Sequence, residues 1–322
     1  MTRVVLTLLA LVAASPAFAQ GEANYPDRTV RIVVPFPAGS ATDIVSRLMA
    51  QKFSVKLGQQ FIVENRPGAS GNLGADVTAK AAPDGYTLGG ITASTHGVAP
   101  ALGARLPYDP IKDFKPVGMI GASPYVLVLY SGIAAKSVAE LTALARTRPG
   151  KLTYGSAGLA SLAHLAAALY TSDMGIDITH IPYKSSAQSV IDIIAGRLDM
   201  QFATVGPTLE NIRDGKLRAL ATTGRKRVSS LPEVPTMMEA GVKGYDVAVW
   251  LAYAMPAGTP DAIVGKLNRA MGEILREPEV IDTLQKQGFD PDPGPPDAVT
   301  ARIRSETEKW RALVAKTGIK AE

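Results

Sequence analysis

The chain has 322 residues, of which 46% are hydrophobic and 20% charged, and its 34 Lys and Arg against 29 Asp and Glu give a formal net charge of +5. This composition can bury a sizeable core and argues against intrinsic disorder. The absence of cysteine and the presence of three histidines exclude disulfide scaffolds, zinc–thiolate sites and cysteine nucleophiles, and argue against a His-rich metal centre. The basic residues are scattered, so the chain lacks the electrostatic footprint of a nucleic-acid-binding protein.

The first 19 residues have the pattern of a secretory signal peptide. Arg3 supplies a positive charge, an apolar run extends from Val4 to Ala14, and Ala17-Phe18-Ala19 has the small residues of a cleavage site. We therefore predict cleavage after Ala19 and export of the mature chain. No later stretch reaches the roughly twenty consecutive apolar residues that a membrane-spanning helix needs.

Strand-like and helix-like segments alternate from residue 29 onward. The first series is expected to contain strands at 29–34, 61–64 and 86–91 and helices at 43–53 and 73–81. An apolar stretch at 117–130 leads into a second series, with helices at 138–146, 159–170 and 187–195 and strands at 152–155, 178–182 and 200–204. Strands at 217–222 and 246–255 and helices at 260–276 and 296–316 complete the chain. This alternation predicts an α/β protein of two lobes, each with a mixed, mostly parallel sheet flanked by helices.

Small and hydroxyl-bearing residues gather where the predicted strands end and helices begin. Four such turns lie at 35–43, 65–74, 92–96 and 154–164. The first turn of a helix offers unpaired N–H groups and a positive dipole end, and a cleft between two lobes is a common place for a small molecule. Because these turns combine many donors with few full charges, they favour an anion, and a carboxylate is the natural ligand.

Two residues in these turns have alternative interpretations. Asp43 either caps the helix that follows or holds an amino group of a ligand, and we favour the cap. His164 lies three residues after Ser161 and could pair with Ser161 or Ser156 as base and nucleophile. The G-x-S-x-G elbow of hydrolases is absent, and no acidic residue is obviously placed to orient the imidazole. We therefore favour a structural or ligand-adjacent histidine and expect no catalytic residue.

Over its whole mature length the chain resembles the periplasmic receptors of tripartite tricarboxylate transporters, often called the Bug family. The resemblance rests on segments in fixed order, among them VPFPAGSATD (34–43), ENRPGASGNLGAD (64–76), STHGVAPAL (94–102), YGSAGLASLAHL (154–165), HIPYKSSAQSVIDIIAGRLDMQF (180–202) and W-x-x-x-x-MPAGTP (250–260).

The resemblance implies a two-lobed type II periplasmic-binding-protein fold, the Venus flytrap, in which the chain crosses between lobes twice. We expect residues 24–122 plus 226–322 in lobe 1 and 123–225 in lobe 2, with the return crossing between 222 and 248. The implied function is capture of a small mono-, di- or tricarboxylate, aliphatic or aromatic, and its delivery to the membrane permease subunits of a transporter. We expect a monomer without enzyme activity, cofactor or metal. A ligand-presenting co-receptor for a histidine kinase and an exported Ser/His hydrolase are the alternatives.

The resemblance also implies that backbone amides and hydroxyls of the turns hold the ligand carboxylate. The positions that match are Phe36, Pro37, Ala38, Gly39, Ser40, Asp43, Gly68, Ala69, Ser70, Asn72, Ser94, Thr95, His96, Ser156, Ser161, His164, Tyr183, Ser185, Ser186, Ala187 and Thr204. Ser40, Ser185 and Ser186 depart from the glycines that are usual in the family. Because each departure changes size or hydrogen bonding, the identity of the ligand cannot be copied from a relative.

Overall fold

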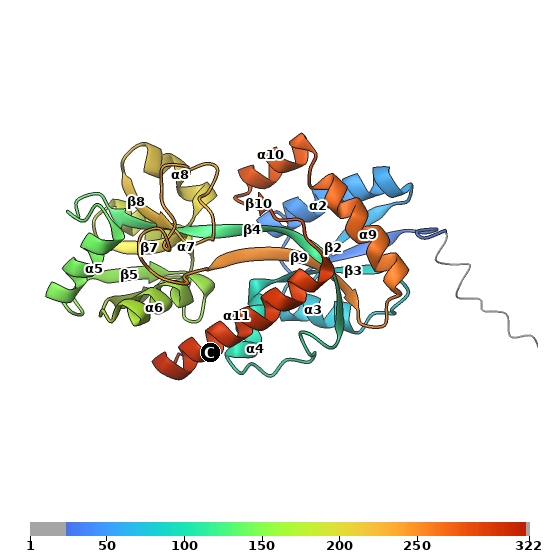
Figure 1. Ribbon diagram of the computed structural model, residues 1–322, viewed down its shortest axis with the longest axis horizontal. Coiled ribbons are helices and arrows are strands. Elements are labelled where there is room, and N and C mark those ends of the chain that lie inside the picture. The colour runs from blue at the N-terminus through green and yellow to red at the C-terminus, as the bar shows by residue number, and fades with distance from the viewer. Residues whose placement is uncertain (1–23, 320–322) are drawn as a thin grey trace, which may run out of the picture.

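The computed structural model describes residues 24–319, so the predicted signal peptide at 1–19 lies outside the described residues. The fold has two α/β lobes, which lie along the longest axis of the molecule (Figure 1). A single long strand, β4 (Phe114–Tyr130), runs through both. No helix in the range 24–319 has the length and apolar character needed to cross a bilayer.

The first lobe is built on a sheet in the order β2-β1-β3-β9-β4. Its strands are β1 (Val30–Val34), β2 (Phe61–Asn65), β3 (Thr87–Thr92), β9 (Ala248–Pro256) and the short β10 (Asp290–Pro291), which pairs with β4. Its helices are α2 (Ala41–Leu57), α3 (Asn72–Ala79), α4 (Ala99–Ala101), α9 (Asp261–Ile274), α10 (Pro278–Lys286) and α11 (Pro296–Thr317). β1 is parallel to β2 and β3, whereas β9 is antiparallel to β3 and β4.

The second lobe continues the sheet from β4 through β7 and β5 to β6, with β8 on the other side of β4. Its strands are β5 (Thr153–Ser156), β6 (Thr179–Pro182), β7 (Met200–Thr204) and β8 (Leu217–Thr222). Its helices are α5 (Val138–Thr147), α6 (Leu162–Met174), α7 (Ser186–Ile194) and α8 (Val205–Arg213). β5 is parallel to β6 and β7, so both lobes combine parallel pairs with antiparallel ones at β4.

Two extended segments connect the lobes. β4 pairs with β9 as far as Pro124 and with β7 from Tyr125, so it changes partners between these two residues. On the return, the Val247 N–H donates to the Thr223 carbonyl of the second lobe at 2.9 Å, and β9 begins at the next residue. The division of the chain into 24–122 plus 226–322 and 123–225 stays a prediction.

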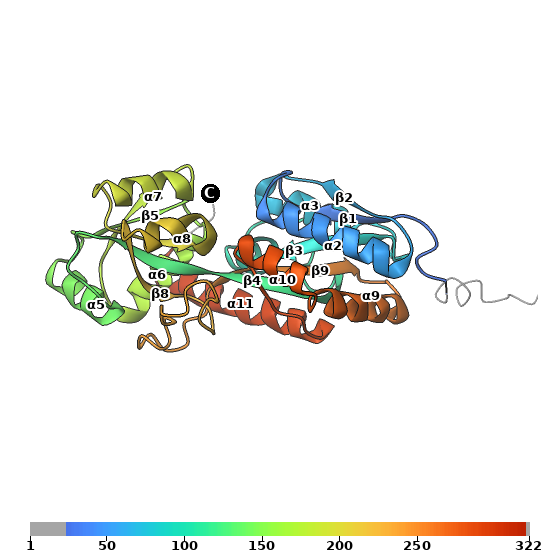
Figure 2. The same cartoon turned by 90° about the horizontal axis from the view of Figure 1, so that it is seen from above.

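The helix α11 also extends beyond one lobe. It runs alongside β4 between the lobes (Figures 1 and 2). Trp310 is fully buried in the cluster of apolar residues that includes Tyr170 on α6 of the second lobe. Near the end of the helix, the Lys316 ammonium donates to the Ser172 carbonyl on α6 at 3.0 Å. The C-terminal helix therefore contacts both lobes.

The predicted strands and helices are confirmed, with boundaries shifted by a few residues, and the apolar stretch at 117–130 is part of β4. The helix expected from 159 begins later, at Leu162, because Gly158 and Ala160 have positive φ angles of 109° and 56° and Ser161 is the N-cap. Three helices, α4, α8 and α10, were not predicted from the sequence. Pro278 at the first position of α10 is a helix-start signal that was available.

Candidate functional site

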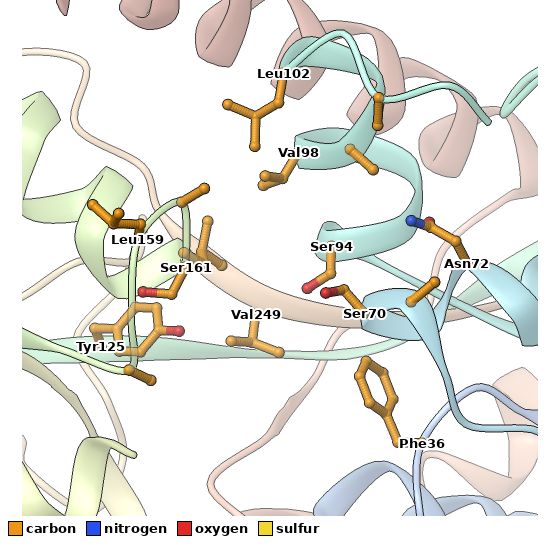
Figure 3. Close-up of a pocket in the computed structure, with 16 residues that line it drawn as sticks. Phe36, Ser70, Asn72, Ser94, Val98, Leu102, Tyr125, Leu159, Ser161 and Val249 are labelled. Carbon is orange, nitrogen blue, oxygen red and sulfur yellow. The ribbon is translucent and has the colours of Figure 1, made fainter. Parts of the chain in front are cut away.

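A cavity of about 610 Å³ lies between the two lobes (Figure 3). The first lobe contributes the turn before α2, the loop that leads into α3 and the turn after β3, and the second lobe contributes the loop between β5 and α6. The lining residues are Phe36, Ala69, Ser70, Asn72, Ser94, Val98, Ala99, Leu102, Ala104, Tyr125, Ala157, Leu159, Ala160, Ser161, Leu162 and Val249. Strand ends and helix starts from both lobes therefore meet at one space.

A second cavity of about 390 Å³ shares Phe36, Ser94 and Val249 with the first, so the two are neighbouring parts of one interlobe cleft. It reaches the N-termini of α2 and α8 and the turn between α10 and β10. Its other lining residues are Ser40, Ala41, Thr42, Thr92, Ser123, Thr204, Gly206, Pro207, Gln287 and Phe289. Among the described residues that line these two cavities, none carries a full charge.

Four neutral donors line the larger cavity. The hydroxyls of Ser70 and Ser94 point toward the same space in Figure 3, with Asn72 beside them. The Tyr108 hydroxyl lies 2.7 Å from Asn72 Oδ1 and 2.9 Å from the Thr95 carbonyl, and Asn72 Nδ2 keeps its N–H groups free of partners among the described residues. Tyr125 reaches the cavity from β4, and burial raises the pKa of its phenol, so the hydroxyl keeps its proton. These groups can donate hydrogen bonds to an anion without supplying a counter-charge.

The turn before α2 is fixed by a network around Asp43. Ser40 is the N-cap and accepts from the Asp43 N–H at 3.2 Å, while Asp43 accepts from the Gly39 N–H at 2.9 Å. Arg47 and Asn65 donate to the same carboxylate at 3.0 and 2.8 Å. Burial would raise the pKa of Asp43, but these hydrogen bonds hold it below its ordinary value. Asp43 thus acts in the helix start, as the favoured interpretation expected, although Ser40 occupies the N-cap position itself.

The loop before α3 turns sharply. Four consecutive residues, 68–71, have positive φ angles, from 47° at Ala69 to 137° at Gly68. A Cβ at Gly71 would come within 2.9 Å of the Thr95 methyl group and 3.4 Å of the Phe36 ring. A glycine at this position therefore allows the loop to pack closely against two other turns of the cleft.

His96 lies in the core of the first lobe and does not line either cavity. Its side chain is fully buried, with ring centroids 5.7 Å from Tyr108 and 4.5 Å from Phe114. Nδ1 is 2.8 Å from the Thr95 hydroxyl. Burial lowers the pKa of His96 to about 3, so the imidazole is neutral. The aromatic packing thus gives the histidine a buried position within the lobe, and the ligand contact that the family resemblance implies stays a prediction.

The turn after β5 does not form the Ser–His164 pair that the hydrolase alternative requires. Ser156 is fully buried, and its hydroxyl donates to the Gly158 carbonyl at 2.9 Å. His180 Nε2 lies 2.7 Å from the same oxygen. Ser161 also donates to the Gly158 carbonyl and accepts from the His164 backbone N–H. Ser156 thus meets His180 instead of His164, and Ser161 meets only the backbone of His164.

The predicted site residues divide into two groups. Those that line the cleft are Phe36, Ser40, Ala69, Ser70, Asn72, Ser94, Ser161 and Thr204. Those that line neither cavity are Pro37, Ala38, Gly39, Asp43, Gly68, Thr95, His96, Ser156, His164, Tyr183, Ser185, Ser186 and Ala187. Several of the second group support the turns, as Ser185 does by capping α7. Ligand contact by any of these residues stays a prediction.

The sequence did not predict the apolar residues that line the cleft, or the lining residues that lie on the strands β4 and β9. Val98 and Leu102 directly follow the third predicted turn, so helical spacing could have indicated them. Tyr125 and Val249 lie on β4 and β9, and Phe289 lies between α10 and β10. No local pattern marks these three residues, because only the pairing of distant strands brings them to the cleft. Within residues 24–319, no group of three or more His, Asp or Glu could hold a metal ion.

Known proteins match this chain over almost its whole length. A family model described as "Tripartite tricarboxylate transporter family receptor" matches residues 45–319. Protein BugT of Bordetella pertussis is 36% identical over 322 residues, which is 99% of both chains. The solved structure of Rpa4515 from R. palustris with adipate is 35% identical, with a TM-score of 0.76 over 92% of this chain and 99% of that one. A TctC solute-binding protein from Polaromonas without ligand has 27% identity and a TM-score of 0.83 over 91% and 99% of the two chains.

Proposed function

The chain belongs to the tripartite tricarboxylate transporter receptor family, and we propose that it captures a small organic carboxylate in the interlobe cleft and delivers it to the permease subunits of such a transporter. Members of this family are solute-binding receptors rather than enzymes. The proposal includes export to the periplasm after cleavage at Ala19. N-terminal sequencing of the exported protein tests that part, with Gln20 as the expected first residue.

The observation that carries the carboxylate proposal is the chemistry of the cleft wall. Ser70, Asn72, Ser94 and Tyr125 bring donors to one cavity, and the described lining residues contribute no carboxylate that would repel an anion. Hydrogen bonds in which the acceptor is ionised are stronger than those between neutral groups. A carboxylate can therefore be held by such donors without an arginine clamp.

The rest of the larger cavity favours a hydrocarbon body behind the carboxylate. Val98, Leu102, Leu159 and Val249 supply apolar wall from both lobes. Burying such surface adds to affinity at about 25 cal/mol per Å² of apolar area. The relative Rpa4515, solved with adipate, supports including flexible dicarboxylates among the first candidates.

Calorimetry on ligand-stripped protein tests the proposal. Succinate, adipate, citrate and benzoate cover two dicarboxylates of different length, a tricarboxylate and an aromatic monocarboxylate, and adipamide is the uncharged match to adipate. We expect at least one carboxylate to bind and adipamide not to. Binding of adipamide with no response to any of the carboxylates would overturn the proposal.

A further inference from the structure

The loop Ala157–Ser161 is the wall that the second lobe presents to the larger cavity. Its conformation is unusual, because Gly158 and Ala160 have φ angles of 109° and 56°. Residues other than glycine rarely adopt positive φ, and such a conformation persists only where the surroundings enforce it. The contacts that enforce it here therefore control the shape of the binding site.

Two imidazoles hold the loop at its ends. At the start, His180 Nε2 is hydrogen-bonded to the Ser156 hydroxyl, which in turn bonds to both the carbonyl and the N–H of Gly158. At the end, the Ala160 N–H donates to His164 Nδ1 at 3.0 Å. The residue with the strained φ thus has its backbone N–H bound directly by a histidine side chain.

The two rings also support each other. Their centroids are 4.1 Å apart and their planes differ by 11°, a parallel stack, and Tyr154 on β5 stacks on His180 at 4.8 Å. His164 is on α6 and His180 on β6, so the stack ties a helix and two strands to the loop between them. His164 is 6% exposed and belongs to the packed interior of the lobe, whereas His180 is half-buried on β6.

Two charged rings do not fit this arrangement. His164 Nδ1 must be unprotonated to accept from the Ala160 N–H, and two positive charges at stacking distance would repel each other. Burial lowers the pKa of His164, and burial followed by the charge of His164 lowers the pKa of His180 to about 4. Tyr154 and the two rings are the titratable groups that face one another.

We infer that His164 and His180 are positioning residues, which as an uncharged stacked pair hold the Ala157–Ser161 wall in its ligand-binding conformation. This inference rests on the proposed function, because it assigns the loop to the carboxylate-binding cleft. It differs from the family expectation for His164, since the side chain acts on the loop backbone and not on the ligand.

Two substitutions of the same residue separate the hydrogen bond from the ring. His164→Phe keeps an aromatic ring against His180 but removes the acceptor, whereas His164→Asn keeps an oxygen near the position of Nδ1. With adipate as the calorimetric probe, we expect His164→Phe to weaken binding about ten-fold, because the strained Ala160 loses its partner. We expect His164→Asn to stay within about three-fold of wild type, because an acceptor remains.

A double substitution tests whether the effect passes through Ala160. Glycine adopts positive φ without steric cost, so Ala160→Gly should make the loop less dependent on His164. The loss of adipate affinity caused by His164→Phe is therefore expected to be smaller in the Ala160→Gly background than in wild type. An equal loss in both backgrounds would overturn the assignment.

NMR of the ligand-free protein decides the inference independently of the ligand. In wild type, the Ala160 amide resonance should shift in step with protonation of His164, and in His164→Asn this titration should vanish while the neutral-pH loop spectrum is kept. In His164→Phe the loop resonances 157–161 should move. If wild type does not bind adipate, the proposed function fails for that probe. The NMR comparison alone then decides whether His164 positions the loop. Unchanged loop resonances in His164→Phe would refute the positioning role.

Discussion

Tyr125 shows how a single residue gains a functional position from its place in the fold. In the sequence it lies inside an apolar run, where an aromatic side chain predicts core packing. In the structure it stands where β4 leaves β9 and begins to pair with β7, so its phenol faces the cavity between the lobes (Figure 3). The side chain is 8% exposed, and its hydroxyl bonds to no other described residue. A ligand would supply the missing acceptor.

We predict that Tyr125→Phe weakens carboxylate binding about ten-fold while it leaves the fold intact. A hydrogen bond to a charged group contributes about 1.5 to 3 kcal/mol, and the loss of one such bond accounts for this change. The measurement is calorimetry with the tightest carboxylate found for the wild type. Tyr170→Phe is the matched control, because that hydroxyl bonds to Thr142 at 2.7 Å, buried within the second lobe. Equal affinity of Tyr125→Phe and wild type would show that the phenol does not reach the ligand.

At the scale of the element, the helix starts on the two sides of the cleft share one design. In α2, Ser40 accepts from the N–H of Asp43, and Asp43 accepts from the N–H of Gly39. In α6, Ser161 accepts from the N–H of His164, and His164 accepts from the N–H of Ala160. In both cases the residue before the N-cap has positive φ. This reciprocal arrangement is a variant of the capping box.

The two helix starts differ in how far the sequence predicts them. The Ser-x-x-Asp pattern before α2 is a known cap signal, so the role of Asp43 was readable locally. His164 is not a usual capping residue, and its partner ring on β6 is brought to it by strand pairing that no local pattern encodes. The buried position of His96 was not readable for the same reason, because its aromatic neighbours Tyr108 and Phe114 follow in a later segment.

Two glycines in the first-lobe turns should respond differently to alanine. Gly39 has a φ of 81°, a Cβ added to it would meet open space, and its N–H is used by Asp43. Gly39→Ala should cost about 1 to 2 kcal/mol of unfolding free energy from backbone strain, with ligand affinity nearly unchanged, because Gly39 lines neither cavity. Gly71→Ala adds a Cβ that meets the Thr95 methyl at 2.9 Å, so it should also reduce affinity.

Urea unfolding and calorimetry on these two variants measure stability and affinity separately. Loss of binding in Gly39→Ala at unchanged stability would mean that the turn before α2 offers its backbone to the ligand, as the sequence alone suggested.

At the scale of the molecule, the alternation of strands and helices predicted the two α/β lobes, because each turn and each periodic segment is encoded locally. The segments that connect the two lobes were harder to predict from the sequence. β4 belongs to both sheets, and α11 packs behind both lobes and bonds to α6 through Lys316. Such contacts depend on which distant surfaces meet after folding, and a single sequence does not contain that information in a readable form.

The neutral state of all three histidines predicts a loss of stability in acid. The folded-state pKa of His96 is about 3 and that of His180 about 4, and that of His164 is also lowered, against about 6.5 in an unfolded chain. Groups with lowered pKa stabilise the fold above the unfolded pKa, and this contribution is lost as pH falls from about 6.5 toward the folded value. For the fully buried His96 the loss amounts to about 2 kcal/mol between pH 7.5 and 5.

Urea unfolding of wild type and His96→Phe at these two pH values measures the His96 contribution. The variant should be less sensitive to acid by roughly the same 2 kcal/mol, because phenylalanine does not titrate. An identical pH dependence of the two proteins would contradict a neutral buried imidazole at this position.

The last prediction concerns the angle between the lobes. Ser70 and Ser94 of the first lobe and Ser161 of the second line one cavity, and the hydroxyls of Ser70 and Ser94 have no partners among the described residues. A ligand that bonds to both walls would gain contacts if the lobes moved closer together.

We therefore expect a bound carboxylate to draw the lobes together by a hinge motion at the two crossings, residues 124–125 and 247–248. Small-angle X-ray scattering of the stripped protein should show a smaller radius of gyration when the tightest carboxylate is added, and no change with an uncharged analogue. Tyr125→Phe at saturating ligand is an informative comparison, since it removes a donor at the crossing but leaves the hinge backbone intact. A radius of gyration that stays constant while calorimetry reports binding would show that the cleft accepts its ligand without closure.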